Sequence, residues 1–313
     1  MHVLEAKCET EIAITNILFA TDFSDISKAA LPYVTALSLR YGSTVHVAHV
    51  LPEVILLRPG APDPAVFGSI YEDAHSSAQE KMQQICSRLR GFPHHSYLRH
   101  GKVCNVLSQI VQEQQIDLVV LGTHGRTGLG KLVMGSVAEE IFRQAACPVL
   151  TVGPRVPSTA NARETRHDRE LPLVQIKFHQ ILCATDLKPT AIRGPAYAFS
   201  LAHEFRTKLT VLHVIEDYGA HLHERPRPID TALRSLEELI PNAEVLAYAP
   251  TFVAQYGSAS ERILEAAAEC NADLIVLGVH PAKGHLSAAT HFGGTTAHRV
   301  VVGASCPVLT VRA

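Results

Sequence analysis

The sequence lacks an excess of charge of either sign. Its 28 basic and 30 acidic residues leave a net charge of −2, which gives no reason to expect a nucleic-acid partner. It also lacks any run of about 18 apolar residues, the length that a membrane-spanning helix needs. These two absences exclude polyanions and membranes from the expected partners.

The sequence also lacks a disulfide pattern and a signal peptide, and both absences bear on the cellular compartment of the protein. The seven cysteines form no C-x-x-C pair and follow no regular spacing, and Cys147 and Cys306 stand just before apolar strands, as small buried hydrophobes do. An odd number of cysteines favours a reducing compartment. Residues 1–14 contain three glutamates and no apolar core segment, which is not the pattern of a signal peptide. We therefore expect a cytoplasmic protein.

What the sequence does contain is an internal repeat. Four segments return in the same order: residues 17–22 as 181–186, 45–50 as 209–214, 117–122 as 273–278, and 147–152, without change, as 306–311. The repeat predicts two domains, residues 1–153 and 174–313. Between them, residues 154–173 are rich in proline, hydroxyl and charged side chains, and we interpret them as a solvated linker.

Within each copy, short apolar runs alternate with helical periods. The runs at 17–20, 45–50, 118–121 and 149–152 are continuous, which is typical of strands buried on both faces. Residues 103–111 and 137–145 carry apolar stripes with helical spacing, and Ser258 and Glu261 have the spacing of a capping box. This alternation predicts that each copy is a doubly wound α/β domain with a five-stranded parallel sheet.

One loop of the first copy has a spacing that suits a phosphate. Residues 122–136 read G-x2-G-x9-G-S between a strand and a helix. Glycine allows a positive φ and leaves no Cβ between the main chain and a ligand, and the free N–H groups of a helix N-terminus favour an anion. A ligand there would lie at the carboxyl ends of the strands. The candidate residues are Gly122, Gly125, Gly135 and Ser136, with Arg126 and Lys131 as compensating charges.

A purely structural interpretation of this loop stays open. Gly122 and Gly125 can serve only to shape a tight turn, and Gly135 can serve only to let a helix pack closely. The strand ends offer the same choice. Asp22 can accept hydrogen bonds from a ligand, or it can cap the following helix together with Ser24. Val50 can pack on a ligand or belong to the core.

The strand ends at 20–22 and 49–50, the glycine spacing and the Cys-Pro-Val-Leu-Thr-Val runs together resemble the universal stress protein family. The resemblance covers both copies and is strongest to tandem two-domain members. It implies a Rossmann-like, adenine nucleotide alpha hydrolase-like fold and ATP as the ligand, with Mg²⁺ as an optional companion. It also implies that Asp22 and Val50 hold the adenosine end, whereas Gly122, Gly125, Gly135 and Ser136 hold the phosphates.

The second copy departs from this pattern. It keeps Asp186, Val214 and Gly278, but Pro281 stands where the first copy has Gly125, and twelve residues rather than nine separate it from the next motif glycine. Proline fixes φ and removes an N–H donor, so we expect weak or no ATP binding by the second copy. The same region is rich in histidine, which is compatible with a zinc site or with solvated loop side chains: His221, His223, His280, His285, His291 and His298.

Three classes of function are compatible with the sequence. The first is a nucleotide-dependent sensor or switch, the second a slow ATPase or nucleotidyl-transfer enzyme, and the third a partner-binding protein with a vestigial pocket. No residue near the loop is an evident general base, because His124 has no carboxylate partner in the motif, and neither an HxGH nor an SGGxDS pattern occurs. We therefore predict no catalytic residue, no resident metal and at most slow hydrolysis.

Duplication also suggests an arrangement. The two copies are expected to pair about a pseudo-twofold axis, and whole chains to form a homodimer or a higher homo-oligomer. The family resemblance implies that the strands at 149–152 and 308–311 meet across this axis. Residues 52–64 contain four prolines and are a candidate lid over the pocket. His49 and His213, which precede the strand-end valines, are expected to be buried and hydrogen-bonded rather than ligands.

Overall fold

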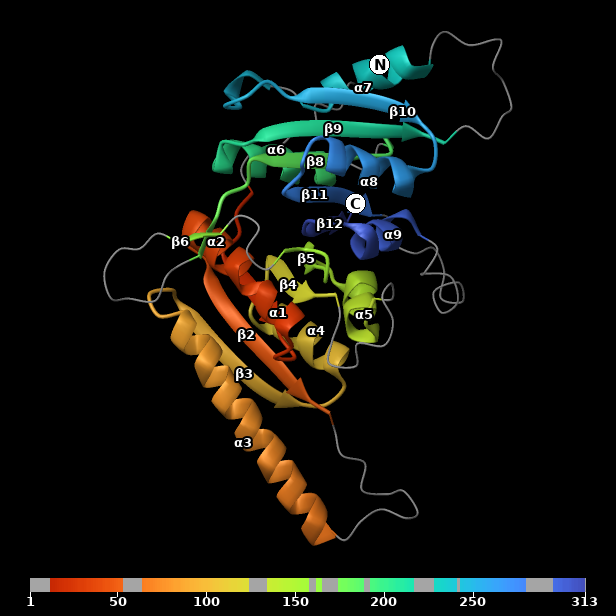
Figure 1. The fold of residues 1–313 in the computed structure, drawn as a ribbon. Coiled ribbons are helices and arrows are strands. Elements are labelled where there is room, and N and C mark those ends of the chain that lie inside the picture. The colour runs from red at the N-terminus through yellow and green to blue at the C-terminus, as the bar shows by residue number, and fades with distance from the viewer. Residues whose placement is uncertain are drawn as a thin grey trace.

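Ten strands form one continuous sheet in the computed structural model, which describes residues 12–52, 64–123, 134–157, 162–164, 174–188, 192–216, 228–240, 243–279 and 295–312 (Figure 1). The first half contributes β1 (Asn16–Ala20), β2 (Thr44–Leu51), β3 (His94–His100), β4 (Leu118–Gly122) and β5 (Val149–Val152). The second half contributes β8 (Gln180–Ala184), β9 (Lys208–Ile215), β10 (Thr251–Tyr256), β11 (Leu274–Val279) and β12 (Val308–Arg312). Each half has its five strands in the doubly wound order 3-2-1-4-5, which confirms the fold class.

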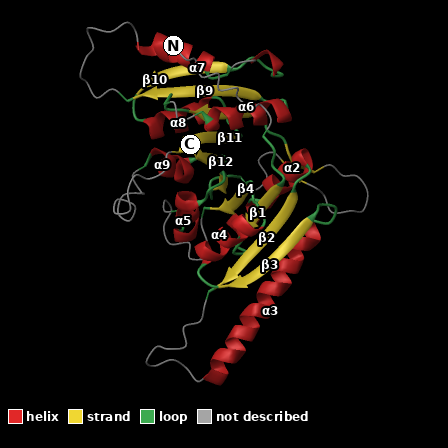
Figure 2. Ribbon diagram, turned by 180° about the vertical axis from the view of Figure 1, so that it is seen from behind, coloured by secondary structure: helices red, strands yellow, loops and turns green. Residues whose placement is uncertain are grey.

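Helices cover both faces of this sheet (Figure 2). One face carries α1 (Asp25–Ala29), α2 (Leu31–Tyr41), α3 (Pro64–Arg88), α6 (Arg193–Phe205) and α7 (Pro228–Glu238). The other carries α4 (Val103–Glu113), α5 (Ser136–Gln144), α8 (Ala259–Glu269) and α9 (Thr296–Gly303). Successive strand residues serve the two layers in turn, since Ile17 and Phe19 pack into the first core and Leu18 into the second. Strands buried on both faces explain why the apolar runs are continuous.

The two halves join edge to edge. β5 and β12 pair antiparallel at the middle of the sheet, as the family resemblance implied. The Thr151 hydroxyl donates to the Val308 carbonyl at 3.1 Å, and the Thr310 hydroxyl donates to the Val149 carbonyl at 3.2 Å. These reciprocal bonds are what a pseudo-twofold axis produces, and the pairing removes one exposed edge from each half.

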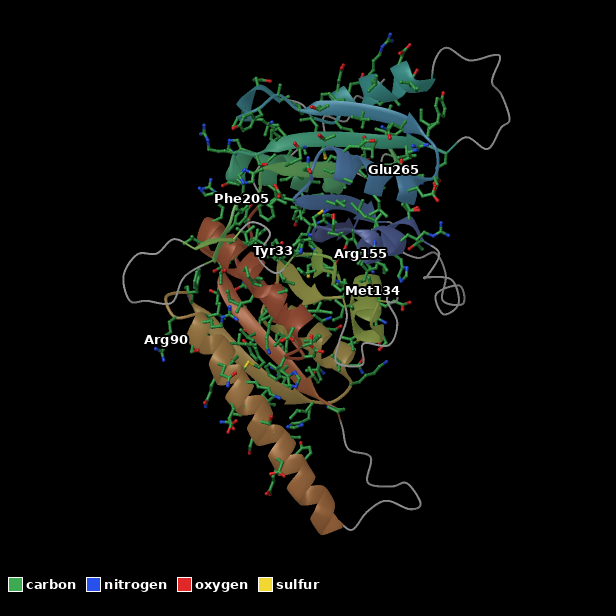
Figure 3. All side chains as sticks on the ribbon, viewed as in Figure 1. Tyr33, Arg90, Met134, Arg155, Phe205 and Glu265 are labelled. Atoms are coloured by element: carbon green, nitrogen blue, oxygen red, sulfur yellow. The ribbon has the colours of Figure 1, made fainter. Side chains whose placement is uncertain are left out.

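An aromatic cluster closes the junction on the face that carries α2 and α6. Phe178 lies 6.3 Å from Tyr33 and 5.0 Å from Phe205, measured between ring centroids, and Figure 3 shows Tyr33 and Phe205 where the two halves meet. Both apolar cores contain residues from both halves. The halves are therefore packed as one body rather than strung on a loose connection.

The sequence between the halves is more structured than its composition suggests. β6 (Ala162–Glu164), inside the expected linker, pairs antiparallel with β7 (Val174–Ile176), which starts the second copy. Ile176 packs against the core beside α2, which anchors this small ribbon. Composition misses such an element because a three-residue strand has no readable period.

The cysteines behave as the sequence indicates. Burial raises the pKa of the Cys306 thiol to about 12 and that of Cys147 to about 11, so both stay protonated near neutral pH. The cysteines placed in the described ranges are all free thiols. In the same ranges, no helix is long and apolar enough to cross a bilayer.

Candidate functional site

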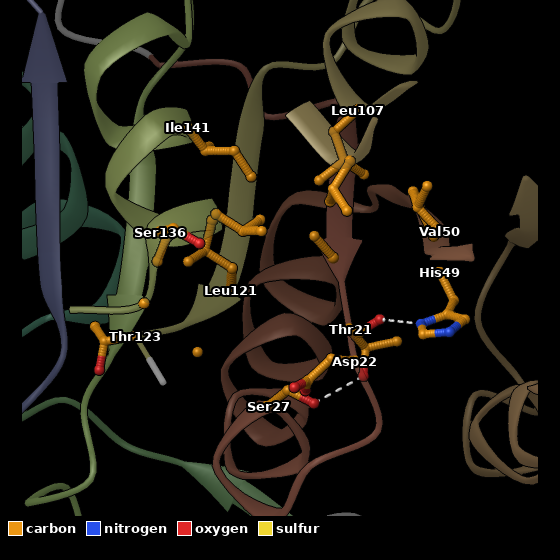
Figure 4. A pocket seen from close by; sticks show the side chains of 17 residues that line it. Thr21, Asp22, Ser27, His49, Val50, Leu107, Leu121, Thr123, Ser136 and Ile141 are labelled. Carbon is orange, nitrogen blue, oxygen red and sulfur yellow. Dashed lines mark hydrogen bonds between the residues drawn. The ribbon is translucent and has the colours of Figure 1, made fainter. Parts of the chain in front are cut away.

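A pocket opens at the carboxyl ends of β1, β2 and β4 in the first half (Figure 4). Its described walls enclose about 200 Å³ and bring together five of the residues singled out in the sequence. These five are Asp22, Val50, Gly122, Gly135 and Ser136. Gly125, Arg126 and Lys131 lie outside the described residues. The pocket therefore brings together residues more than a hundred positions apart in the sequence. They meet at the carboxyl ends of the strands, where parallel α/β folds bind ligands.

Asp22 occupies a sharp turn directly after β1. The Asp22 carboxylate accepts hydrogen bonds from the Ser24 N–H at 3.0 Å and from the Ser24 hydroxyl at 2.6 Å. Ser24 in turn caps α1 by accepting from the Ser27 N–H at 3.2 Å. Between them, Phe23 has a φ of 65°, a left-handed conformation that a bulky residue rarely adopts. Ser24 is therefore the N-cap of α1, whereas Asp22, considered as a capping residue alongside it, holds Ser24 in place and also lines the pocket.

The N-terminus of α5 forms the opposite wall. Gly135 is the N-cap, with an extended backbone (φ −63°, ψ 145°), and Ser136 is the first helical residue. Because the N-cap is a glycine, no side chain of its own accepts from the first-turn N–H groups. The Gly135 N–H donates to the Thr123 carbonyl at 2.8 Å, which fixes the helix to the end of β4. The positive end of the α5 dipole consequently faces the pocket.

Gly122 is required for a reason other than a positive φ. Neither Gly122 nor Gly135 is in the left-handed region, so the expectation that these two glycines supply a positive φ is wrong. A Cβ at Gly122 would lie 3.1 Å from the Ser27 Cα and N atoms in the backbone of α1. Close packing of α1 on the end of β4 therefore accounts for glycine at this position, a role that the sequence suggested for Gly135 rather than for Gly122.

Sequence reasoning missed several polar residues of the pocket floor. The Thr21 and Ser27 hydroxyls lie 2.8 Å apart, and the Thr21 carbonyl is 2.7 Å from Nδ1 of His49, which is buried (Figure 4). In the second half, Nδ1 of His213 lies 2.9 Å from the Thr185 carbonyl. The expectation that both histidines are hydrogen-bonded is confirmed, but only His49 is buried, because His213 is partly exposed. The signal was available, since the repeat keeps threonine and histidine at both pairs of positions.

The second half has a pocket in the equivalent place, at the ends of β8, β9 and β11. Asp186, Val214 and Gly278 line it, as their first-half counterparts line the first pocket. Lys188 replaces Ser24 of the first half and binds Asp186, with its ammonium group 2.7 Å from one carboxylate oxygen. Its backbone N–H donates to the other oxygen at 3.2 Å.

The helix N-termini at this second pocket have side-chain caps. Thr295 is the N-cap of α9 and accepts from the His298 N–H at 3.2 Å. Ser258 is the N-cap of α8, but its hydroxyl makes no capping bond, so the predicted capping box is wrong. Instead, the carboxylate of Glu216, at the end of β9, accepts from the Ala259 N–H at 2.9 Å. Burial lowers the pKa of His298, which leaves its ring neutral near pH 7.

Most histidines of the second half's histidine-rich loops lie outside the described residues. Of the six histidines named for a zinc site, only His298 belongs to the described residues. Across the ranges with defined placement, no group of three or more histidine, cysteine, aspartate or glutamate side chains is arranged to hold a metal ion. The candidate lid is likewise outside the description except for Pro52 and Pro64.

Two doubly wound domains on one sheet, each with a pocket at its strand ends, define a tandem α/β protein of the nucleotide-binding type of architecture. A family model described as "Universal stress protein family" matches residues 13–153 and again 177–312. The chain belongs to the universal stress protein family, and the resemblance seen in its motifs is confirmed.

Individual relatives agree with this membership. A universal stress protein of Mycolicibacterium smegmatis is 24% identical over 310 residues, covering 95% of this chain and 96% of the relative. A shorter universal stress protein of Methanocaldococcus jannaschii is 28% identical over 138 residues, which is 44% of this chain and 80% of the relative. The solved structure of a universal stress protein from Archaeoglobus fulgidus has the same fold, with a TM-score of 0.68 and 22% identity over 95% of this chain and 96% of that one.

Proposed function

We propose that the first half binds ATP in the pocket above β1, β2 and β4, and that the protein acts as a nucleotide-dependent sensor or switch in a stress response. The observation that supports this most is the meeting of Asp22 and Val50 with the N-terminus of α5 around one cavity. Those residues divide into an adenosine end and a phosphate end. Cytoplasmic location and pairing of whole chains remain predictions from the sequence.

The adenosine end suits a purine nucleoside. Val50, Leu107 and Leu121 provide apolar walls for a ring, and Asp22 provides carboxylate oxygens beside them. A pocket that is mostly apolar with a few placed polar groups is the usual form of a small-molecule site. Asp22 would accept from the amino group of the base or from a ribose hydroxyl, with its orientation set by Ser24.

The phosphate end suits an anion. The first-turn N–H groups of α5 and the Ser136 hydroxyl are donors at the pocket wall, and a helix N-terminus without a side-chain cap attracts negative charge. Arg126 and Lys131 would add positive charge from the motif loop, as the sequence predicts. The donor set thus fits a phosphate chain attached to a base held by Asp22, and Mg²⁺ would accompany the phosphates.

Mass spectrometry of small molecules released from the purified protein tests this proposal. We expect ATP or another adenine nucleotide in stoichiometric amount, close to one per chain rather than two, because side chains already bind a first-turn N–H group of each helix at the second pocket. Phosphate release measured on the same samples distinguishes a binding module from a slow ATPase. Absence of released nucleotide, together with no binding of added ATP, would contradict the proposal.

Replacing Asp22 separates its two roles. Asp22→Ala should weaken ATP binding about tenfold, the lower end of the effect of losing a hydrogen bond to a charged group. Ser24→Ala should instead lower the free energy of unfolding by about 1 kcal/mol through loss of an N-cap. It should weaken ATP binding less than Asp22→Ala does, because the Asp22 carboxylate remains and the backbone N–H at position 24 still donates to it. Calorimetric titration and thermal unfolding measure both quantities. Equal ATP affinity in Asp22→Ala and wild type would show that Asp22 only caps.

A further inference from the structure

The second pocket is built by both halves of the chain. Phe142, near the end of α5 in the first half, lines it together with residues of the second half. The Phe142 carbonyl accepts a hydrogen bond from the Arg312 guanidinium, on β12, at 3.4 Å. The described walls enclose about 400 Å³, which falls within the roughly 300–1,000 Å³ of small-molecule sites. The cavity is therefore of a size for a ligand, and the isolated second half would lack one of its walls.

Its apolar surface repeats that of the first pocket. Val214 stands where the first pocket has Val50, and Leu277 where it has Leu121. Ile263 of α8 takes the place of Leu107 of α4. Threonine and aspartate, Thr185 and Asp186, again end the first strand. These shared walls suit the same kind of flat ring and hydroxyl-bearing group as the first pocket.

The helix N-termini that would attract phosphate to the first pocket have counterparts in the second pocket, but there side chains of the protein bind their N–H groups. The N–H of Ala259 at the start of α8 is bonded to the Glu216 carboxylate, and the N–H of His298 in α9 is bonded to the Thr295 hydroxyl. In the first half, the N-cap of α5 is Gly135, which has no side chain to accept from the first-turn N–H groups. Glu216 also adds a negative charge where the first half has Pro52. A phosphate entering the second pocket would meet capped helix ends and a carboxylate.

The remaining charges are balanced within the pocket. Lys188 contacts both oxygens of Asp186, one through its ammonium group and one through its N–H. Pro281 in the following loop has no N–H to offer, unlike Gly125 of the first copy. A ligand without charge disturbs none of these contacts, whereas an anion would have to displace Glu216 or compete with Asp186 for Lys188.

We propose that the second pocket is a separate site for an uncharged, ring-bearing small molecule of the nucleoside class, without phosphate, and that Phe142 of the first half completes it. The two pockets then bind related ligands that differ in phosphorylation: the first binds a phosphorylated ligand and the second an unphosphorylated one. α5 contributes to both, with Gly135, Ser136 and Val137 at the first pocket and Phe142 at the second.

The test uses adenosine and ATP as ligands, the full-length chain, and one blocking substitution in each pocket. Val137 lines the first pocket and Thr296 the second, each at an exposed position in the first turn of α5 or α9, and each directly after the motif hydroxyl residue. Val137→Phe should fill the first pocket and Thr296→Phe the second. Calorimetric titration gives the affinity and number of sites, and circular dichroism checks that both variants fold.

We expect the Val137→Phe chain to bind one adenosine and to bind ATP no more tightly than adenosine. Thr296→Phe should remove that adenosine site. The proposal is overturned if Val137→Phe abolishes adenosine binding, or if ATP binds this variant more than about tenfold tighter than adenosine, a difference of about 1.4 kcal/mol. ATP binding by Thr296→Phe tests the first pocket separately, so failure of the proposed ATP site would be visible on its own.

The contribution of Phe142 is tested by a conservative change. Phe142→Leu keeps an apolar side chain but removes the ring, and should weaken adenosine binding in the Val137→Phe background about 2- to 10-fold, the range for one aromatic pair. Phe199→Leu is the matched control, because Phe199 is as deeply buried but packs in the other core. Equal adenosine affinities in the two variants would show that Phe142 does not take part.

Discussion

Replacing Ser136 by aspartate is expected to weaken ATP binding by at least about 100-fold, because like charges brought together in a binding site cost several kcal/mol. Ser136 is the first residue of α5 and lies at the pocket wall, so the new carboxylate would occupy the space proposed for the phosphates. The same carboxylate should stabilise the folded chain by about 0.3–1 kcal/mol, since a negative charge at a helix N-terminus interacts favourably with the dipole. Binding and stability should therefore change in opposite directions.

The second half supplies a matched control for this substitution. Thr295 has the same place in the motif, but it is already the side-chain cap of α9. Aspartate is an equally good N-cap, so Thr295→Asp should leave both the unfolding free energy and ATP affinity near wild type. Titration calorimetry and chemical denaturation of the two variants give the four values. Comparable losses of ATP affinity in both would mean that the phosphate site is not at α5.

Replacing Gly125 by proline, which copies the second repeat into the first, is expected to abolish retention of nucleotide during purification. Proline removes an N–H donor and restricts the preceding residue as well as its own φ. The loss of a charge-assisted hydrogen bond and of the loop geometry should weaken ATP binding about 100-fold. Gly125 and Pro281 lie outside the described residues, so this prediction depends on the sequence comparison alone. Nucleotide content per chain, measured by absorbance after denaturation, is the readout.

The reverse substitution, Pro281→Gly in the second copy, tests whether the loop glycine alone is enough to create an ATP site. Pro281→Gly should not create a second ATP site, because Thr295 still caps α9 and Glu216 still occupies the N-terminus of α8. The loop of the second copy is also three residues longer. Retention of ATP by Gly125→Pro at the wild-type level would show that the motif loop does not hold the phosphates.

Most of the fold could be predicted from the repeat. Its four matched segments correspond to the four inner strands of each half, and their order fixed the doubly wound topology. The outer strands β3 and β10 were not located, because His94–His100 is polar and half exposed at the sheet edge and so gives no apolar run. The antiparallel meeting of β5 and β12 follows from duplication of a symmetric pair, which the resemblance to a known family suggested.

The candidate site was partly predictable for the same reason. Strand ends and helix starts are marked by local sequence, so Asp22, Val50, Gly122, Gly135 and Ser136 could be assigned to one edge of the sheet in advance. The origin of the Gly122 requirement could not be found that way, since it depends on how closely α1 packs on β4. Phe142 was expected on an apolar stripe, but its place in the second pocket depends on how the two halves meet.

The contrast between the two copies shows how a duplicated pocket can diverge without a change of fold. Two differences in the turns that follow the strands change which helix N–H groups and which carboxylates already have a partner in the chain: Pro52 corresponds to Glu216, and Ser24 to Lys188. Each involves a surface or pocket residue, whereas the buried strands of the two halves stay alike. If the two pockets bind different ligands as proposed, differences of this kind would alter ligand preference at little cost in stability.

Amide hydrogen exchange, followed residue by residue with and without ligand, tests the central claim most directly. Addition of ATP should slow exchange of the N–H groups of residues 136–138 in the first turn of α5, whereas addition of adenosine should not. Residues 296–298 of α9 should form no phosphate contact, so neither ligand should slow their exchange in that way. Unchanged exchange at residues 136–138 while one ATP is bound per chain would contradict a phosphate seat at the start of α5.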